Sequence, residues 1–538
     1  MRPITVMQTI FRLWSSAKYR ALKNWIRDRI PAAIVSGKRG GETAAIVVEL
    51  ALRMEEALAG LEGSEEEVML VTTDFSKFFD SIPWTLIQEI GTCMGLPSSL
   101  LNMYGKLYKG MERHVSVGQW TSMEPITATN GVIQGDALSL LWAAIALTVW
   151  ATRIEGRCGG VETKVFVDDR YVMGSDAKVM QEALWETARH DRMAGFLLNA
   201  KKCMSTATTA RGRRRLSKMT MDAERISAVR AFKALGHTVS GVRRRVMKVT
   251  KMRVKKAEQT ARRVKILKMP TRKQKAAGAM GLVMPRAAYG AWLTRMAKKD
   301  RGPLATTMME LAWGIKGGKF RAKELLKSLV LPTHRVDPDD VMDYQTITTM
   351  TRLMRRNEEL RRRVGRMVAH LKGGGAKKYD GPFPVKRLLE VLGRMEGEVD
   401  EELNVKHDAL PAFNLVEEHP GWVAHAARYM IRSSLWEKLA IRAAKGERND
   451  FNGLQIIDVA ATTRTIRKQT EGGIKKRTLE MLVTGAIPTW QRCAKYKHPP
   501  IKECEPPSSE VCPFCSQGVP EDMEHILWGC QRWEEERE

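Results

Sequence analysis

Two adjacent aspartates end the short apolar run Val165-Phe166-Val167-Asp168-Asp169. Neighbouring carboxylates at the end of a strand oppose folding, because like charges repel and burial disfavours ionisation. A bound divalent metal removes this conflict and uses both carboxylates. A third carboxylate, Asp74, ends a second apolar run, Val68-Met69-Leu70-Val71-Thr72-Thr73, and the segment Asn130-Gly131-Val132-Ile133-Gln134-Gly135-Asp136-Ala137-Leu138-Ser139 lies between the two runs. This order of segments predicts a divalent-metal site that contains three aspartates.

The segments around these aspartates alternate between strand and helix patterns. β-branched and apolar residues predict a buried strand over 67–73 and two strands over 163–173, with a tight turn at Asp168-Asp169. Helices are predicted from about Pro83, over 138–152 and over 176–194, and a short strand and turn over 195–202. Residues 2–60 read as mostly helical, with a glycine-rich break at 36–41. The predicted fold class is therefore α+β, a small antiparallel sheet backed by helices.

The charge of the chain is strongly positive and unevenly distributed. The 538 residues suffice for two to four domains, and the formal net charge is +28. Residues 211–300 contain 27 Lys and Arg against 4 Asp and Glu. A solvated set of charged helices would explain such a run, but an excess of this size favours a polyanionic partner such as nucleic acid. Binding to that partner should weaken steeply with salt.

Neither a membrane span nor a secretory signal is predicted. The longest apolar stretch, 137–150, is too short to cross a bilayer and reads as a buried helix. The N-terminus lacks an apolar core followed by a small-residue cleavage site. Four cysteines stand far apart in the sequence and read as buried thiols: Cys93, Cys158, Cys203 and Cys493. An intracellular location, either the nucleus or a cytoplasmic ribonucleoprotein, is expected, and secretion is not.

A second metal-ligand pattern lies near the end of the chain. Cys512, Cys515, His525 and Cys530 have the spacing Cys-x₂-Cys-x₉-His-x₄-Cys. Three thiolates and one imidazole complete a tetrahedral zinc shell, which is typical of structural rather than catalytic sites. Buried reduced thiols are the alternative interpretation. Cys504 is a spare thiol that does not fit the spacing.

Several segments together resemble the motifs of reverse transcriptases, in particular those of non-LTR (LINE-type) retrotransposons. The similar segments are Arg2-Pro3-Ile4, Asp74–Asp80, Asn130–Ser139, Phe166–Asp169, Gly195–Lys202, Leu235-Gly236 and, at the zinc pattern, Glu524–Cys530. The resemblance covers roughly residues 1–245. It departs from the usual pattern at Phe78, Leu140 and Val167, none of which is an expected metal ligand.

This resemblance implies an RNA-directed DNA polymerase that adds dNTPs to a primer 3′-hydroxyl with two Mg²⁺ ions. The expected magnesium ligands are the carboxylates of three residues and one backbone carbonyl: Asp74, Asp168, Asp169 and Phe75. Lys202 is expected near the triphosphate, where it can protonate the leaving pyrophosphate, although a plain surface lysine is nearly as good an interpretation. Phe79 corresponds to the aromatic gate that excludes a 2′-hydroxyl, and Gln134 and Gly135 to the residues beside the nascent base pair. Lys38 and Arg39 are weaker candidates for phosphate contacts.

The resemblance also implies an organisation and a set of partners. We expect a right-hand polymerase with fingers and palm over 1–245, a basic helical thumb over 246–330, a mostly helical linker of unknown role over 331–500, and a CCHC zinc knuckle over 505–538. The expected partners are an RNA template, a DNA primer or target, dNTPs and the RNA of the element itself. We expect a chain truncated at one or both ends, with neither an endonuclease nor a ribonuclease H signature. Two alternatives remain: a catalytically inactive nucleic-acid-binding remnant, and a group II intron-type maturase.

Overall fold

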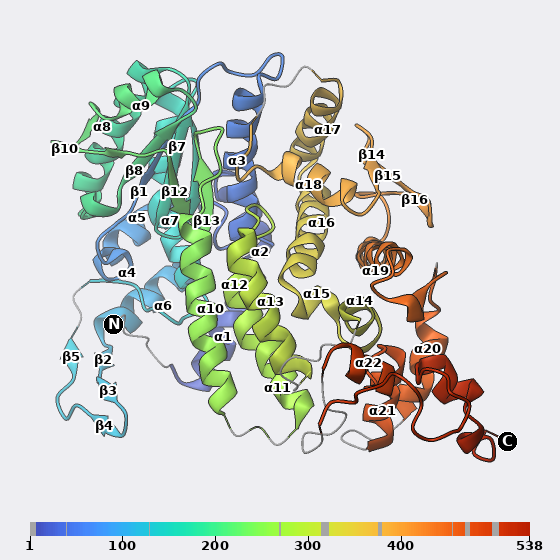
Figure 1. Cartoon of the computed structure of the whole chain (residues 1–538). Coiled ribbons are helices and arrows are strands. Elements are labelled where there is room, and N and C mark those ends of the chain that lie inside the picture. Colours follow the sequence, from blue (N-terminus) through green and yellow to red (C-terminus); the bar gives the residue numbers. More distant parts are fainter. Residues whose placement is uncertain are drawn as a thin grey trace. The chain divides into compact units, whose positions relative to one another are not determined.

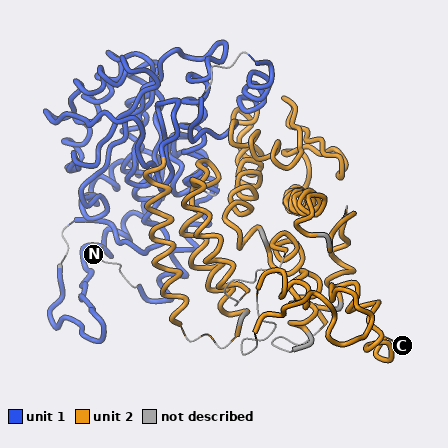
Figure 2. Tube along the Cα trace, viewed as in Figure 1, with its two compact units in different colours: residues 1–246, 362–385 blue, residues 247–361, 386–538 orange. Residues whose placement is uncertain are grey.

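The chain divides into two compact units, which Figure 2 colours separately. The first comprises Met1–Val246 with Arg362–Val385, and the second Met247–Arg361 with Lys386–Glu538. The computed structural model describes residues 7–537 except 39, 128–129, 268, 270, 314–321, 375–378, 455, 469–473 and 498–504. Arg2-Pro3-Ile4, Arg39 and Cys504 therefore lie outside the described residues.

A five-stranded sheet forms the centre of the first unit (Figure 1). Its order is β11-β8-β1-β7-β6, with bounds β1 Met69–Thr73, β6 Glu162–Phe166, β7 Asp169–Gly174, β8 Met204–Ala207 and β11 Ser227–Ala228. The predicted strand over 67–73 and the predicted strand pair over 163–173 are confirmed.

The expected all-antiparallel sheet is wrong at one edge. β11 pairs parallel to β8, whereas the other neighbours pair antiparallel. Parallel neighbours need a crossover connection, and here the chain crosses over through α9 (Ala210–Leu216) and the short strands β9 (Thr220–Met221) and β10 (Glu224–Arg225). β8 was not predicted because it has only four residues, and the crossover was not predicted because its elements are short and rich in charge.

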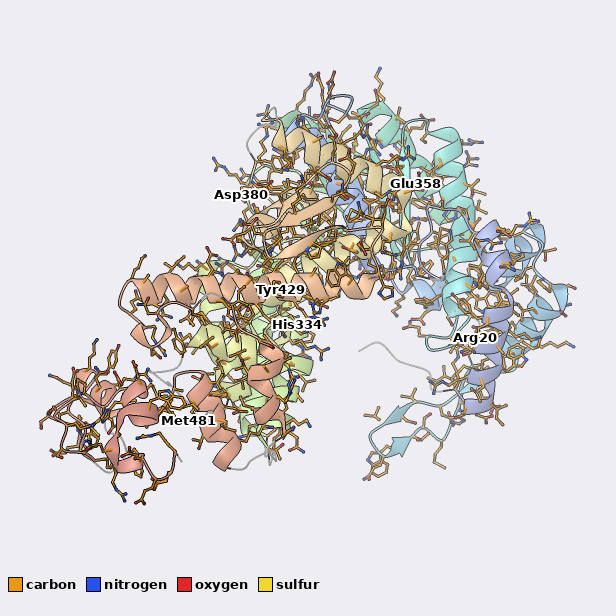
Figure 3. The ribbon with its side chains drawn as sticks, turned by 90° about the vertical axis from the view of Figure 1, so that its right-hand side faces the viewer. Arg20, His334, Glu358, Asp380, Tyr429 and Met481 are labelled. Atoms are coloured by element: carbon orange, nitrogen blue, oxygen red, sulfur yellow. The ribbon has the colours of Figure 1, made fainter. Side chains whose placement is uncertain are left out.

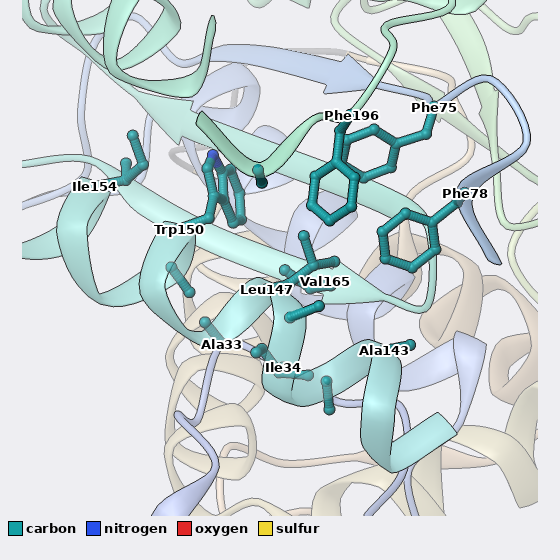
Figure 4. Packing of buried hydrophobic residues seen from close by; sticks show 14 of the residues in the cluster. Ala33, Ile34, Phe75, Phe78, Ala143, Leu147, Trp150, Ile154, Val165 and Phe196 are labelled. Atoms are coloured by element: carbon teal, nitrogen blue, oxygen red, sulfur yellow. The ribbon is translucent and has the colours of Figure 1, made fainter. Parts of the chain in front are cut away.

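Helices α7 (Ser139–Arg157) and α8 (Ala177–Ala194) pack on the sheet, and α3 (Thr43–Ala59) packs against β6. Both predicted helices are confirmed, although α7 extends five residues beyond the predicted end at 152. α8 begins after Asp176, whose carboxylate accepts hydrogen bonds from the N–H groups of Lys178 and Val179. Figure 4 shows the core between these layers, where Phe75, Phe78 and Phe196 gather.

The rest of the unit contains α1 Thr9–Ala21, α2 Lys23–Arg29, α4 Phe78–Ser81, α5 Trp84–Cys93, α6 Ser98–Lys109, β2 Glu112–Arg113, β3 Ser116–Val117, β4 Trp120–Thr121, β5 Ile126–Thr127, β12 Ala231–Ala234 and β13 His237–Ser240.

The segment 362–385 belongs to the first unit because two buried glutamates of α3 bind it. Glu56 pairs with Arg363 at 2.7 Å. Glu55 accepts hydrogen bonds from the Tyr379 hydroxyl at 2.8 Å and from the Val385 N–H at 2.9 Å. Asp380, labelled in Figure 3, also donates its backbone N–H to the Arg243 carbonyl at 2.6 Å. Buried carboxylates are costly unless they are paired, so these contacts satisfy Glu55 and Glu56.

The second unit is mostly helical, as predicted for residues after 246. Its first helix, α10 (Lys248–Ile266), buries Val254, Ala257, Ala261 and Val264 on one face and exposes basic residues on the other. The remaining helices are α11 Arg272–Gly278, α12 Met284–Ala288, α13 Lys298–Trp313, α14 Lys323–Leu325, α15 Thr333–Val336, α16 Pro338–Arg356, α19 Pro420–Ala444, α20 Val459–Lys468, α21 Ile474–Val483 and α22 Trp490–Lys495. α17 (Glu358–Lys372) and α18 (Pro384–Gly393) cross the boundary between the units.

One sheet of the second unit was not predicted. Its order is β14 (Glu398–Val399), β15 (Asn404–His407) and β16 (Leu410–Asn414), all antiparallel. These strands are short and carry polar and proline residues, so their apolar alternation is weak. Within the part of the chain that the structure describes, no helix combines the length and apolar character needed to span a bilayer.

Candidate active site and cysteine cluster

The three predicted aspartates come together at one end of the central sheet. Asp74 directly follows β1, and Asp169 is the first residue of β7. The register pairs Thr73 with Arg170, so Asp74 and Asp169 lie at neighbouring positions on adjacent strands. Burial, together with the negative charges of Asp168 and Asp74, raises the pKa of Asp169 to about 6. The carboxylates are therefore close enough to repel one another.

The turn that carries Asp168 is held by a segment from the glycine-rich break. Val167 has a positive φ of 60°, which is strained for a β-branched residue. Its N–H donates to the Ser36 hydroxyl at 2.9 Å. Just before the turn, Val165 donates to the Ala33 carbonyl at 2.8 Å and accepts from the Val35 N–H at 3.0 Å. These hydrogen bonds hold the strained turn in place.

Lys202 lies next to the aspartates. Its Nζ donates to Asp74 Oδ2 at 2.7 Å, while the lysine side chain stays 54% exposed. The backbone before Lys202 pairs with the backbone after β1, since the Asn199 N–H donates to the Asp74 carbonyl at 2.8 Å. Lys202 therefore partly balances the negative charge of the site.

Arg170 is a site residue that the sequence reasoning missed. Its side chain is fully buried behind Asp169, and its guanidinium binds both oxygens of Asp191 at 2.7 and 2.6 Å. The same group lies 4.0 Å from the ring centroid of Phe75 and donates to the Thr73 hydroxyl at 3.1 Å. Arg170 thus ties β7, β1 and α8 together beneath the aspartates. The available signal was a lone basic residue directly after the aspartate pair.

The Asn130–Ser139 segment packs against the short helix α4. Val132 donates its N–H to the Phe79 carbonyl at 2.7 Å, and Gly131 donates to the Ile82 carbonyl at 3.1 Å. Gly131 has a φ of +100°, and a Cβ there would lie 2.9 Å from the Asp80 Cα, so only glycine fits. The segment therefore runs beside the partly buried Phe79, and within it Gln134 is partly buried and Gly135 is exposed.

Asp136 anchors this segment, and the sequence reasoning assigned it no role. Its buried carboxylate accepts hydrogen bonds from the Ser15 hydroxyl and, at 3.0 Å, from the Tyr104 hydroxyl. Tyr108 accepts a hydrogen bond from the Ile133 N–H at 3.2 Å. α1 and α6 thereby fix the loop that carries Gln134 and Gly135. The single acidic residue of the motif was the available signal.

The β12–β13 hairpin turns at Leu235-Gly236, one of the segments that resemble reverse transcriptase motifs. Both residues have positive φ, 47° and 85°, as a tight two-residue hairpin turn requires. The positive charge of Lys233, on β12, lowers the pKa of Asp169 slightly against the larger effects of burial and the two carboxylates. The hairpin therefore extends to within electrostatic range of the aspartates.

Residues 1–239 match the family described as "Reverse transcriptase (RNA-dependent DNA polymerase)". They form a reverse transcriptase domain. The domain contains every predicted polymerase residue, from Asp74 to Lys202.

The solved structures similar to the chain include telomerases. The apo telomerase of Candida tropicalis is 9% identical, with a TM-score of 0.34, over 68% of this chain and 57% of that chain. The Candida albicans telomerase in complex with a TWJ fragment of telomeric RNA is 10% identical, with a TM-score of 0.29, over 68% of this chain and 54% of that chain. The chain thus spans about half the length of these telomerases. A comparison with curated proteins gives no match.

The three aspartates of the reverse transcriptase domain offer the oxygen donors that Mg²⁺ prefers. The three aspartates do not come together as tightly as the ligands of a closed metal cage. Among the described residues, the His, Cys and acidic side chains that lie close enough to share one metal ion are the four near the C-terminus. Mutual repulsion and the Lys202 ion pair explain the looser arrangement. Lys38, a weaker candidate for phosphate contact, donates its Nζ to the Pro31 carbonyl at 2.8 Å.

Cys512, Cys515, His525 and Cys530 form that C-terminal cluster. Their ligand atoms all lie within 4.8 Å of one another. The Sγ atoms of Cys512 and Cys530 are 3.9 Å apart, and Cys515 Sγ is 3.3 Å from His525 Nε2. Bonds of about 2.3 Å to sulfur and 2.0 Å to nitrogen would place tetrahedral ligands about 3.5 to 3.8 Å apart. The donor set and its spacing therefore fit a zinc ion.

Proposed function

We propose that this chain copies RNA into DNA by adding dNTPs to a primer 3′-hydroxyl, as part of a non-LTR retroelement protein. The observation that carries the proposal is the meeting of Asp74, Asp168 and Asp169 at one end of the sheet, inside a reverse transcriptase domain. The negative charges of Asp168 and Asp74 raise the pKa of Asp169, and a site with such repulsion has a clear purpose if cations bind there.

The aspartates would hold two Mg²⁺ ions, which activate the 3′-hydroxyl and stabilise the leaving oxygens. The chain itself contributes charge and position. Arg170 and the Ser36 hydroxyl keep the strand ends and the Asp168 turn in place without occupying the carboxylates. Lys202 has an exposed side chain next to Asp74, from which it can reach an incoming triphosphate and donate a proton to the pyrophosphate.

Phe79 would select the sugar. Phe79 is partly buried against the core, while its neighbour Phe78 is fully buried within it. A flat apolar surface beneath the ribose leaves no room and no hydrogen-bond partner for a 2′-hydroxyl, which favours dNTPs. The loop with Gln134 and Gly135 would then contact the nascent pair, and Asp136 would keep it in register.

The cysteine cluster would bind one structural Zn²⁺, and its similarity to the knuckle of non-LTR proteins supports that subtype. The seven described cysteines are free thiols, which agrees with a reducing, intracellular location in a complex with the RNA of the element.

Primer extension on a poly-rA template with an oligo-dT primer and Mg²⁺ tests the activity. We expect extension with dNTPs but not with NTPs, and its loss in Asp168→Asn/Asp169→Asn. Glu62→Gln/Glu224→Gln removes two charges at exposed positions and should extend as the wild type does. A wild-type chain that binds RNA yet never extends would establish the inactive remnant instead.

Phe79→Val tests the gate. The smaller side chain should allow UTP incorporation on the same template while TTP incorporation persists. Unchanged exclusion of UTP in this variant would rule out Phe79 as the selecting residue.

A further inference from the structure

A large hollow opens in the first unit at the end of the sheet opposite to the aspartates. It measures 1540 Å³, and its walls include Glu65–Glu67 just before β1, Ser175 just after β7 and Thr208-Thr209 just after β8. The aspartates lie at the other ends of β1 and β7. Five strand residues at about 3.4 Å each separate the two sites by roughly 17 Å. The hollow is therefore distinct from the polymerase site.

The hollow is strongly basic. Seven arginines and three glutamates line it. Two of the glutamates are already neutralised: Glu65 pairs with Arg53 at 2.8 Å and Glu67 with Arg215 at 3.3 Å. Arg245 pairs with Asp380 at 3.0 Å.

Four of the lining arginines remain available. Within the described part of the chain, no ion pair involves the side chains of Arg211, Arg230, Arg243 and Arg244, and all four are exposed. An arginine without a carboxylate partner offers a planar fork of donors that matches phosphate.

The floor of the hollow holds another arginine in place. Arg213 donates to the Ala207 carbonyl at 2.6 Å and to the Gly241 carbonyl at 3.2 Å. Burial lowers the pKa of Arg213, and the nearby positive charge of Arg230 lowers it further. Two guanidinium groups are thus held within repulsive range, and an anion between them would relieve that repulsion.

We propose that this hollow binds the sugar–phosphate backbone of RNA, independently of base sequence. The volume exceeds the roughly 300–1,000 Å³ of a small-ligand pocket, so a macromolecule is the better fit. The described lining contains no aromatic side chain on which a base would stack. It does contain hydroxyls and carboxylates that can accept a hydrogen bond from a ribose 2′-hydroxyl, which DNA lacks.

This assignment to RNA also rests on the proposed function, because a polymerase that copies RNA must hold template beyond the nucleotide being read. The hollow would bind this template RNA, or a folded part of the same RNA molecule, away from the catalytic end of the sheet.

Binding of a fluorescent 30-nucleotide RNA to the full chain, measured by anisotropy between 50 and 200 mM salt, tests the proposal. The variant is Arg211→Gln/Arg243→Gln/Arg244→Gln, which leaves the structural Arg213 untouched. Each lost phosphate contact should reduce the salt slope by about 0.7, so three lower it by about 2. Over this fourfold change in salt, the wild type should lose about 18-fold more affinity than the variant. The matched control, Lys109→Gln/Lys178→Gln/Lys218→Gln, removes three exposed charges outside the hollow.

A DNA strand of the same sequence separates the outcomes. If the triple arginine variant loses less affinity for DNA than for RNA, relative to the wild type, the result supports the hollow as an RNA site. If the variant loses equal affinity for RNA and DNA, or if the variant and the lysine control lose equal affinity for RNA, the proposal is overturned. Primer extension by the wild type reports the polymerase separately: a chain that extends nothing but shows the RNA-specific loss would refute the proposed function and keep the hollow.

Discussion

The buried pair of Arg170 and Asp191 allows a sharp prediction. Arg170→Met keeps the length and apolar stem of the side chain but leaves the Asp191 carboxylate, 6% exposed, without its cation. Removing one partner of a buried ion pair costs about 3–5 kcal/mol, chiefly because the other charge stays buried and unpaired. The contacts with Phe75 and Trp150, at 4.0 and 5.0 Å from the guanidinium, are lost as well.

Calorimetry of the full chain measures this effect. The first unit has about the size at which 1 kcal/mol shifts the melting temperature by about 2 °C, so its transition should fall by about 6–10 °C. Arg189→Met is the control on α8, the helix that carries Asp191, because Arg189 is 58% exposed and lies 4.0 Å from Glu186. That change should move the transition by less than about 1 °C.

The double variant Arg170→Met/Asp191→Leu decides the mechanism. It removes both charges, so it should recover most of the lost stability. Burial alone would raise the pKa of Asp191, but Arg170 and His190 hold it below the usual value. The stabilisation by the pair is therefore present above about pH 4 and is lost as the pH falls through the folded pKa. A single variant that melts within 2 °C of the wild type, or a double variant no better than the single, would refute this reasoning.

Three further predictions concern other parts of the chain. Asp169→Asn should raise the melting temperature at pH 7 in the absence of metal. The gain in the free energy of unfolding is at most about 3 kcal/mol for a carboxyl whose pKa is raised to about 6, and it should disappear toward pH 4. An unchanged melting temperature at pH 7 would contradict the repulsion. Asp136→Ala should remove the shared acceptor of the Ser15 and Tyr104 hydroxyls, which keep only their mutual contact at 3.3 Å, and should cost about 1–3 kcal/mol. It should also raise the KM for dNTP, whereas a normal KM would show that the loop needs no anchor. A zinc chelator should release one zinc per chain and expose residues 505–537 to proteolysis. Cys530→Ser should cause the same proteolysis without a chelator. A chelated chain that still resists the protease would show that the cysteines are plain thiols.

The strands β1, β6 and β7 of the central sheet and the aspartates beside them were predictable because the signals are local. The first apolar run covers β1 and the second ends β6, so each aspartate stands where a strand ends or begins. The spacing of the four C-terminal ligands was likewise sufficient to predict their convergence. A strand of five buried residues leaves little freedom in where its end lies.

The residues that support the site were not predictable in the same way. Arg170 finds its partner 21 residues later, and Asp136 finds Ser15 121 residues earlier. Such pairs depend on which helices the sheet brings together, and no local pattern records that choice. β11 was missed for the same reason, because two residues gain strand character only from the neighbour that they meet.

The segment 33–36 has one further consequence. β6 ends the row of strands, so its outer side presents hydrogen-bonding groups that would otherwise recruit a strand from another molecule. Ala33 and Val35 occupy the groups of Val165 on that side. On the ribosome this covering segment emerges some 130 residues before the strand that it protects, so the edge is closed as soon as it forms. The same few residues that hold the Asp168 turn thereby guard the newly made chain against aggregation.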